Sequence, residues 1–243
     1  MSKDYLIITP LRIFSGYFIP SLGPISLYSF AKSNGYEGDL LNFNEIINEK
    51  NIEEHDEIIF NQVQKWIYEN PNAKCIGISI LFSGVFPRGL QIAKTIKKIA
   101  PKISIIFGGI HPTMHAKEIL ENCKEIDYII IGEGEFQFLE LLNKIYNKKQ
   151  TTLSDGIAYR ENNLVVVNQK TKYTDKNSII SLGKLDYSQI DFSKYHSKDM
   201  DNWYNPTNKP IECVVPIMAS RSCPHDCSFC CIHSMLGPSN TYR

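Results

Sequence analysis

Short, continuously apolar segments alternate with segments of helical character along the first part of the chain. Five apolar segments predict buried strands: Tyr5–Ile8, Leu40–Phe43, Cys75–Ile80, Ile103–Phe107 and Tyr128–Ile131. A strand that is apolar along its whole length is buried on both faces, which is typical of a parallel sheet with helices on both sides. The alternation therefore constrains this chain to an α/β fold.

The segments between these strands carry apolar residues at the spacing of a helix. They are Ile25, Tyr28 and Ala31; Ile59, Val63, Trp66 and Ile67; Leu90, Ala93, Ile96 and Ala100; and Phe138, Leu141, Leu142 and Ile145. A shorter helix is predicted over residues 118–122, and Asn51 with Glu54 resembles a capping box. We predict a doubly wound, five-stranded parallel sheet of Rossmann-like or flavodoxin-like type over residues 1–150.

The pattern changes beyond this domain. Gly156–Tyr159 and Leu164–Val167 flank a polar turn and predict a β-hairpin. Residues 170–210 are polar and weakly periodic, so residues 151–210 are expected to be the hairpin and a connector. Ile211–Met218 predicts one more strand, which leads directly into three closely spaced cysteines.

Composition narrows the possible environments and partners. The 26 basic residues balance 26 acidic ones, so no overall positive field favours nucleic acid or anionic membranes. The N-terminus shows no secretion signal, and no apolar run of about 18 residues could span a bilayer. We therefore expect a cytoplasmic protein whose thiols stay reduced.

Small and polar residues follow three of the predicted strands: Ser79–Ser83, Gly108-Gly109 and Gly132–Glu135. The carboxyl ends of parallel strands are where open α/β sheets bind ligands, and glycines there allow close approach. Tight turns alone also explain such glycines. Neither Gly-x-Gly-x-x-Gly after the first strand nor a P-loop pattern is present, so the signatures of dinucleotide and P-loop sites are missing.

Cys223, Cys227 and Cys230 are the most specific chemical signal in the chain. Their Cys-x-x-x-Cys-x-x-Cys spacing, in a chain without a secretion signal, indicates ligands for an iron-sulfur cluster or a metal ion. A zinc site completed by His233 is the competing interpretation. We expect no chemistry from the remaining cysteines, which are Cys75, Cys123, Cys213 and Cys231.

Taken in order, the loop motifs resemble the cobalamin-binding domain of cobalamin-dependent radical S-adenosylmethionine proteins. The matching segments are Ser79-Ile80-Leu81, Gly108-Gly109-Ile110-His111-Pro112-Thr113 and Gly132-Glu133-Gly134-Glu135. The resemblance implies that these loops surround the nucleotide tail and lower face of a corrinoid. The contacts expected from it are Gly23, Ser79, Leu81, Ser83, Gly108, Gly109, His111, Gly132 and Glu133.

Several of these residues have a second interpretation. His111 precedes Pro112 and is equally explained as a structural turn residue. Glu133 and Glu135 either accept hydrogen bonds from the corrin amides or are ordinary acids favoured by the dipole of the following helix.

One motif of many cobalamin-binding domains is absent. The loop Thr9–Gly16 lacks the Asp-x-His-x-x-Gly pattern whose histidine ligates cobalt. This agrees with the radical branch of the family, in which cobalt is commonly left without a protein imidazole. It argues against a role like that of methionine synthase or the mutases.

The cysteine motif with Phe229 before its last cysteine resembles the radical S-adenosylmethionine signature. The resemblance implies that Cys223, Cys227 and Cys230 hold a [4Fe-4S] cluster, with Phe229 among the cofactor contacts. Its fourth iron would bind S-adenosylmethionine. Reduction by an electron donor would then give a deoxyadenosyl radical.

A full (β/α) barrel takes about 200 residues, and only residues 211–243 remain for the radical domain. We therefore expect the start of an incomplete barrel, belonging to a longer enzyme or to a shortened product, with little radical activity of its own. The expected function is methyl transfer or a related radical reaction on an unknown small-molecule or peptide substrate. The alternatives are a non-catalytic corrinoid-binding module and a zinc-binding interaction domain.

Overall fold

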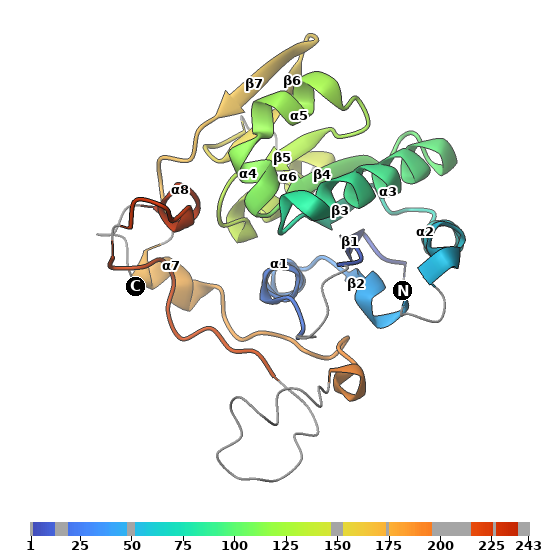
Figure 1. Cartoon of the computed structure of the whole chain (residues 1–243), viewed down its shortest axis with the longest axis horizontal. Helices are drawn as coiled ribbons and strands as arrows, with labels where there is room; N and C mark the ends of the chain where they lie inside the picture. The colour runs from blue at the N-terminus through green and yellow to red at the C-terminus, as the bar shows by residue number, and fades with distance from the viewer. Residues whose placement is uncertain are drawn as a thin grey trace.

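The structure is a computed structural model that describes residues 2–12, 19–47, 52–146, 153–173, 175–195, 215–225 and 227–237. Asn51, Cys213 and the first half of the strand predicted over Ile211–Met218 lie outside these residues. The core is one sheet of seven strands in the order β2-β1-β3-β4-β5-β6-β7 (Figure 1).

The first five strands run parallel, and their order is that of flavodoxin-like sheets. They are β1 (Tyr5–Thr9), β2 (Gly38–Asn42), β3 (Cys75–Ser79), β4 (Ser104–Gly108) and β5 (Tyr128–Ile130). The order reverses between β1 and β3, which both pair with parallel neighbours. In such sheets a ligand site is expected at this reversal.

The hairpin extends the same sheet. β6 (Ile157–Glu161) pairs antiparallel with β5, and β7 (Leu164–Asn168) pairs antiparallel with β6. Asn162 and Asn163 have φ angles of 50° and 65°, as a two-residue type I′ turn requires. The sheet is therefore mixed, and the hairpin is its edge rather than a separate unit.

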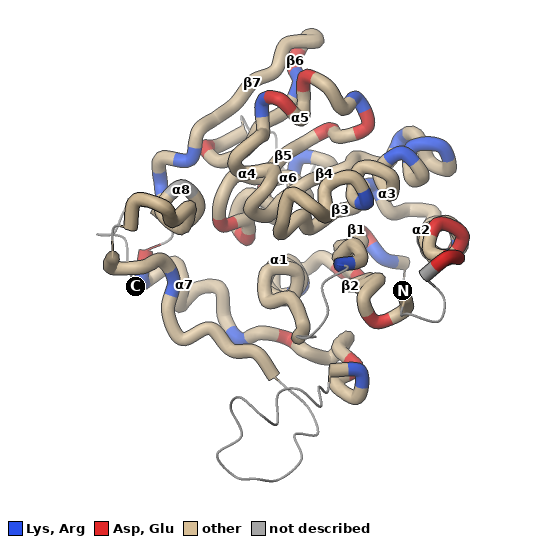
Figure 2. Tube along the Cα trace, viewed as in Figure 1, with Lys and Arg blue, Asp and Glu red and all other residues tan. Residues whose placement is uncertain are grey.

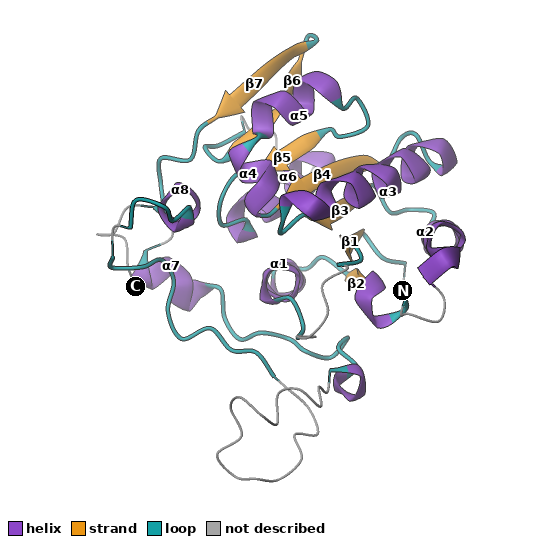
Figure 3. Ribbon diagram, in the orientation of Figure 1, coloured by secondary structure: helices purple, strands orange, loops and turns teal. Residues whose placement is uncertain are grey.

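Helices cover both faces of the sheet (Figure 3). α1 (Leu22–Ser33) and α6 (Glu135–Ile145) pack on the face formed by Tyr5 and Ile7, where Tyr28, Phe138 and Leu141 are buried. The opposite face carries the residues between them, such as Leu6 and Ile8. It is covered by α2 (His55–Glu69), α3 (Phe86–Ile99) and α5 (Ala116–Asn122). Successive side chains of β1 point to opposite faces of the sheet and so contribute to two core layers, as expected of a doubly wound fold.

The remaining segments depart from the sequence prediction in detail. One short helix was expected near residue 118, but the chain forms α4 (Ile110–Met114) and then α5, separated by His115. The stretch predicted as a connector contains α7 (Lys176–Ser181) and a short 3-10 helix, Phe192–Lys194. Residues 215–218 are not a strand, and the last described helix is α8 (Ile232–Leu236).

Charged residues of both signs are spread over the molecule (Figure 2). Lys97 and Lys98 lie in the last turn of α3, and Asp56 and Glu57 lie in the first turn of α2. Among the described helices, none is both long and apolar enough to cross a membrane.

Candidate functional site

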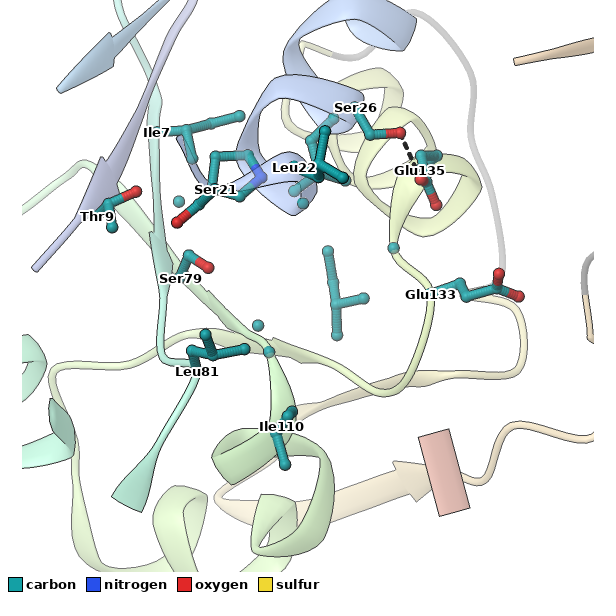
Figure 4. A pocket seen from close by; sticks show the side chains of 18 of the residues that line it. Ile7, Thr9, Ser21, Leu22, Ser26, Ser79, Leu81, Ile110, Glu133 and Glu135 are labelled. Atoms are coloured by element: carbon teal, nitrogen blue, oxygen red, sulfur yellow. Dashed lines mark hydrogen bonds between the residues drawn. The ribbon is translucent and has the colours of Figure 1, made fainter. Parts of the chain in front are cut away.

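A cavity of about 500 Å³ lies at the carboxyl ends of the parallel strands (Figure 4). Its floor consists of strand residues that include Ile7, Gly77, Ile106 and Ile130. The cavity spans β1, β3, β4 and β5, so it sits at the reversal of strand order. Its volume is in the usual range for small-molecule sites, and its floor is apolar.

Two glycines leave room for a ligand to touch the backbone. A Cβ atom on Gly23 would meet no atom within 4 Å, and one on Gly108 would meet only Ile130, at 3.9 Å. Both glycines line the cavity, so a side chain at either position would fill part of the cavity.

Two other glycines serve the protein's own packing. Gly109 has φ +105°, and a Cβ there would lie 2.5 Å from the carbonyl oxygen of Ile80. Gly132 has φ +74°, and its Cβ would lie 2.5 Å from the carbonyl oxygen of Met235 in α8. Only glycine fits these two places without a shift of the backbone.

Polar groups gather where α1 begins. Thr9, Ser21 and Ser79 line the cavity, with Arg12 beside them. The Arg12 guanidinium donates to the Ser21 hydroxyl, and the Arg12 backbone N–H donates to Asn44 Oδ1 at 2.7 Å. Burial lowers the pKa of Arg12 from its usual value. The cavity therefore has an apolar floor and, at this end, polar side chains.

The opposite end contains an ion-pair network that joins distant parts of the chain. Arg221 Nη1 donates to Glu133 Oε1 at 2.9 Å, and Arg221 Nη2 donates to Glu135 Oε1 at 2.6 Å. The Ser26 hydroxyl of α1 also donates to Glu135 Oε1, at 2.6 Å. The side chains of Glu133, Glu135 and Arg221 are only 3%, 7% and 12% exposed.

This network keeps Glu135 ionised. Burial by itself would raise the pKa of Glu135, but the hydrogen bonds and positive charge of Arg221 outweigh it and lower the pKa below 4.5. The same contacts raise the pKa of Arg221 in spite of its burial. Glu135 is also the first residue of α6, where the helix dipole favours an acid.

The structure brings seven of the predicted contacts together in the cavity wall: Gly23, Ser79, Leu81, Gly108, Gly109, Gly132 and Glu133. Ser83 and His111 are not among the lining residues. His111 Nδ1 instead contacts the Ser83 hydroxyl at 2.9 Å, and the His111 ring packs against Phe86 and His115. Their arrangement fits the second interpretation of His111, a structural role near the start of α4.

Cys223, Cys227 and Cys230 lie in the cysteine segment, by which we mean residues 215–237. Cys223 is half-buried, whereas Cys227 and Cys230 are exposed, and all three are free thiols. The Cys230 N–H donates to the Cys227 carbonyl at 3.1 Å, which forms a turn, and Phe229 on this turn is 90% exposed. Within the described ranges, no three His, Cys, Asp or Glu side chains converge as a metal site. The cluster ligands therefore stay a prediction.

Sequence reasoning missed several residues of the cavity. Arg12, Ser21 and Ser26 come from the first loop and α1, while Pro216, Met218 and Arg221 come from the cysteine segment. Arg221 had one available signal: Glu133 and Glu135 follow a buried strand, and two buried carboxylates require a cation. The sequence does not reveal which of its 26 basic residues supplies it.

Comparison with known families identifies the fold around this cavity. A family model described as the B12 binding domain matches residues 10–142, which is more than half of the chain. The chain belongs to the B12-binding domain family. The matched range contains β2–β5 and most of the residues that line the cavity.

Curated relatives include a cyclase and a methyltransferase. The chain is 28% identical over 130 residues to the anaerobic magnesium-protoporphyrin IX monomethyl ester cyclase of Synechocystis, covering 54% of the chain and 23% of the relative. It is 26% identical over 187 residues to an uncharacterized methyltransferase of Pyrococcus horikoshii, covering 73% and 37%. The chain thus spans well under half the length of these relatives.

Solved structures show the same arrangement of elements. The radical S-adenosylmethionine methyltransferase TsrM from Kitasatospora setae, with cobalamin and a [4Fe-4S] cluster bound, superposes with a TM-score of 0.64 at 15% identity. The match covers 100% of this chain and 44% of TsrM. The cobalamin-dependent radical enzyme OxsB gives a TM-score of 0.53 over 74% of the chain and 25% of OxsB. The resemblance to cobalamin-dependent radical S-adenosylmethionine proteins is confirmed.

Proposed function

We propose that this chain holds cobalamin in the cavity at the carboxyl edge of its sheet, as part of a cobalamin-dependent radical S-adenosylmethionine enzyme. The observation that carries the proposal is the position of the cavity. It lies at the reversal of strand order in a B12-binding domain, and Gly23 and Gly108 leave its wall open to close approach.

The residues present fit a corrinoid. The apolar floor suits the face of a macrocycle, and Thr9, Ser21, Ser79 and Arg12 offer polar partners for its amides and nucleotide tail. No histidine occurs among the described residues that line the cavity. We therefore propose that no imidazole of the described residues ligates cobalt. Cobalamin, when bound, would serve as the carrier of the methyl group.

We extend the proposal to a [4Fe-4S] cluster on Cys223, Cys227 and Cys230. Three free thiols on one loop are the donor set that such a cluster needs, and a fourth iron would remain open for S-adenosylmethionine. An electron donor and a small-molecule or peptide substrate would be the partners. Methyl transfer is favoured as the reaction because methyltransferases recur among the relatives.

The zinc alternative finds less support. A zinc ligand needs one ring nitrogen directed at the metal. His233 has its Nδ1 2.9 Å from the Gly237 carbonyl oxygen and its Nε2 2.5 Å from the His225 carbonyl oxygen. Both nitrogens are therefore engaged by the backbone in this conformation. The alternative for the chain by itself is a corrinoid-binding module without catalytic activity.

Anaerobic purification with hydroxocobalamin, followed by iron-sulfur reconstitution, tests the proposal. We expect about one cobalt per chain with a corrinoid absorption spectrum, together with about four irons and four sulfides. Gly108→Leu should abolish corrinoid uptake without removing iron, because its side chain would enter the cavity. Gly84→Leu is the matched control, since a Cβ on Gly84 meets nothing within 4 Å and Gly84 does not line the cavity.

The outcomes separate the candidate functions. Corrinoid uptake without iron would favour the non-catalytic module. One zinc per chain without corrinoid would favour the interaction domain. Failure of the wild-type chain to take up any corrinoid would refute the proposed function.

A further inference from the structure

One wall of the cavity comes from a part of the chain outside the matched B12-binding domain. Pro216, Met218 and Arg221 of the cysteine segment line the cavity, as do Met235 and Leu236 of α8. The family match ends at residue 142. Part of the cavity wall therefore comes from a segment outside the domain, and contacts with the domain must hold that segment in place.

Arg221 makes the charged contacts of this segment with the sheet domain. Its two terminal nitrogens divide between Glu133 and Glu135, at 2.9 and 2.6 Å, and Nη1 also reaches Glu135 Oε2 at 3.3 Å. The planar guanidinium suits such two-carboxylate pairing, and a lysine has no comparable geometry. Arg221 thereby links the start of α6 to the loop that carries the cysteines.

A second contact lies close by. The carbonyl oxygen of Met235 in α8 would be only 2.5 Å from a Cβ atom on Gly132, so α8 rests directly on the backbone between β5 and α6. The Gly132–Glu135 turn is thus contacted by both ends of the cysteine segment. The residues of this turn also line the cavity.

We propose that Arg221 is a positioning residue: its pairing with Glu133 and Glu135 fastens the cysteine segment against the sheet and so completes the wall that retains cobalamin. The inference rests on the proposed function, because it presupposes a corrinoid in the cavity. It goes further in assigning retention of the cofactor to a residue two positions before the first predicted cluster ligand. The protein should then retain cobalamin even when it carries no iron-sulfur cluster.

The test compares dissociation of hydroxocobalamin from the wild-type chain of 243 residues and from its Arg221→Gln variant, without iron-sulfur reconstitution. The loaded protein is diluted into excess buffer, and the corrinoid absorbance that stays with the protein is measured after rapid gel filtration. We expect the rate of cobalamin dissociation to be at least tenfold higher for Arg221→Gln than for the wild type. Arg221→Lys should restore part of the retention, since an ammonium group can pair with one carboxylate at a time. Lys65→Gln is the matched control, because Lys65 is exposed and is not among the residues that line the cavity, and this variant should retain cobalamin like the wild type.

Arg221→Gln leaves two buried carboxylates without their cation, which by itself destabilises the fold. The variant Arg221→Gln/Glu133→Gln/Glu135→Gln removes all the charges of the network at once. It should unfold at nearly the wild-type denaturant concentration and still lose cobalamin at least tenfold faster. A fold defect and a retention defect are thereby measured separately.

Wild-type dissociation rates in a folded Arg221→Gln or triple variant would overturn the inference and leave the proposed function intact. Absence of corrinoid uptake by the wild type would overturn both. Faster dissociation from folded Arg221→Gln, partly restored in Arg221→Lys, would establish Arg221 as a positioning residue for the cofactor.

Discussion

At the scale of single residues, the neighbouring glycines Gly108 and Gly109 have different structural roles in the cavity wall. A Cβ atom on Gly108 would meet only Ile130, at 3.9 Å, whereas Gly109 adopts φ +105° with its α-carbon against the Ile80 backbone. The Gly-Gly pair was recognisable in the sequence, but the sequence could not divide its two functions. The two roles differ because Gly109 packs against the backbone of Ile80, which follows β3, and this is a tertiary contact.

Replacement of Gly109 by alanine should therefore destabilise the fold. The new Cβ would lie 2.5 Å from the Ile80 carbonyl oxygen in a left-handed backbone conformation. We expect a loss of about 2 kcal/mol or more in the free energy of unfolding, measured by urea denaturation. Gly84→Ala, with nothing within 4 Å of its Cβ and no left-handed φ, should change it by less than about 0.5 kcal/mol. Equal stabilities of the two variants would contradict this account.

Prediction of single site residues from the sequence is weakest where a residue acts through partners that are far away in the sequence. The motif around Cys223 is evident in the sequence, but nothing in the sequence singles out Arg221, two residues earlier, as the cation that pairs with Glu133 and Glu135. These residues are separated by more than 80 positions. Spacing patterns describe local structure, whereas ion pairs of this kind follow from the tertiary fold.

At the scale of elements, the sequence predicted the sheet and its helices well because burial imposes clear patterns. Continuous apolar runs gave β1–β5, and the helical spacing of Ile59, Val63 and Trp66 gave α2. The sequence failed where burial is slight. α7 contains no buried residue, and its hydrophobic pattern was correspondingly weak. Residues 215–218 are apolar enough to suggest a strand, but they are exposed or half-buried without forming one, and Pro216 and Met218 line the cavity.

The connector has a structural task that its composition concealed. Gln189 accepts a hydrogen bond from the Leu40 N–H at 2.7 Å, and its amide nitrogen donates to the Gly38 carbonyl at 2.9 Å. These are backbone groups on the outer edge of β2, which is the first strand in the sheet order. The side-chain amide thus substitutes for a neighbouring strand and protects an edge that would otherwise be free to pair.

Gln189→Ala should expose this edge. We expect the Leu40 amide to exchange its hydrogen for deuterium faster, with a loss of about 1 kcal/mol in stability for the missing hydrogen bonds. Lys184→Ala, at an exposed position of the same connector, is the control and should leave this amide unchanged. Unaltered exchange at Leu40 in Gln189→Ala would show that the connector does not protect β2.

At the scale of the whole molecule, two charged contacts hold the later part of the chain on the sheet domain. Lys32 Nζ in α1 contacts Asp186 Oδ2 at 2.8 Å, and Arg221 pairs with Glu133 and Glu135. The hydrogen bond from Lys32 lowers the pKa of Asp186 from 3.8 to about 2. Both Asp186 and Glu135 are therefore ionised in the folded chain at pH values where the unfolded chain begins to bind protons.

Acid should consequently weaken the attachment of these segments. A carboxyl group whose folded pKa is depressed contributes its full stabilisation above its unfolded pKa, here 3.8 for Asp186 and 4.5 for Glu135. The contribution is lost as the pH falls through the lower folded values. Asp186 is partly exposed to solvent, so its share should be about 0.5 kcal/mol, with the buried Glu135 contributing more.

Urea unfolding of the wild type between pH 7 and pH 2 should therefore show a steep decline in stability below about pH 4.5. The double variant Asp186→Asn/Glu135→Gln should be less stable at pH 7, and its stability should decline less as the pH falls, because neither replacement titrates. The two curves should converge in acid, where the wild-type carboxyls are protonated. Parallel curves over the whole range would mean that these two carboxyls do not govern the acid sensitivity. The attachment of the cysteine segment would then depend on its apolar contacts with the cavity wall.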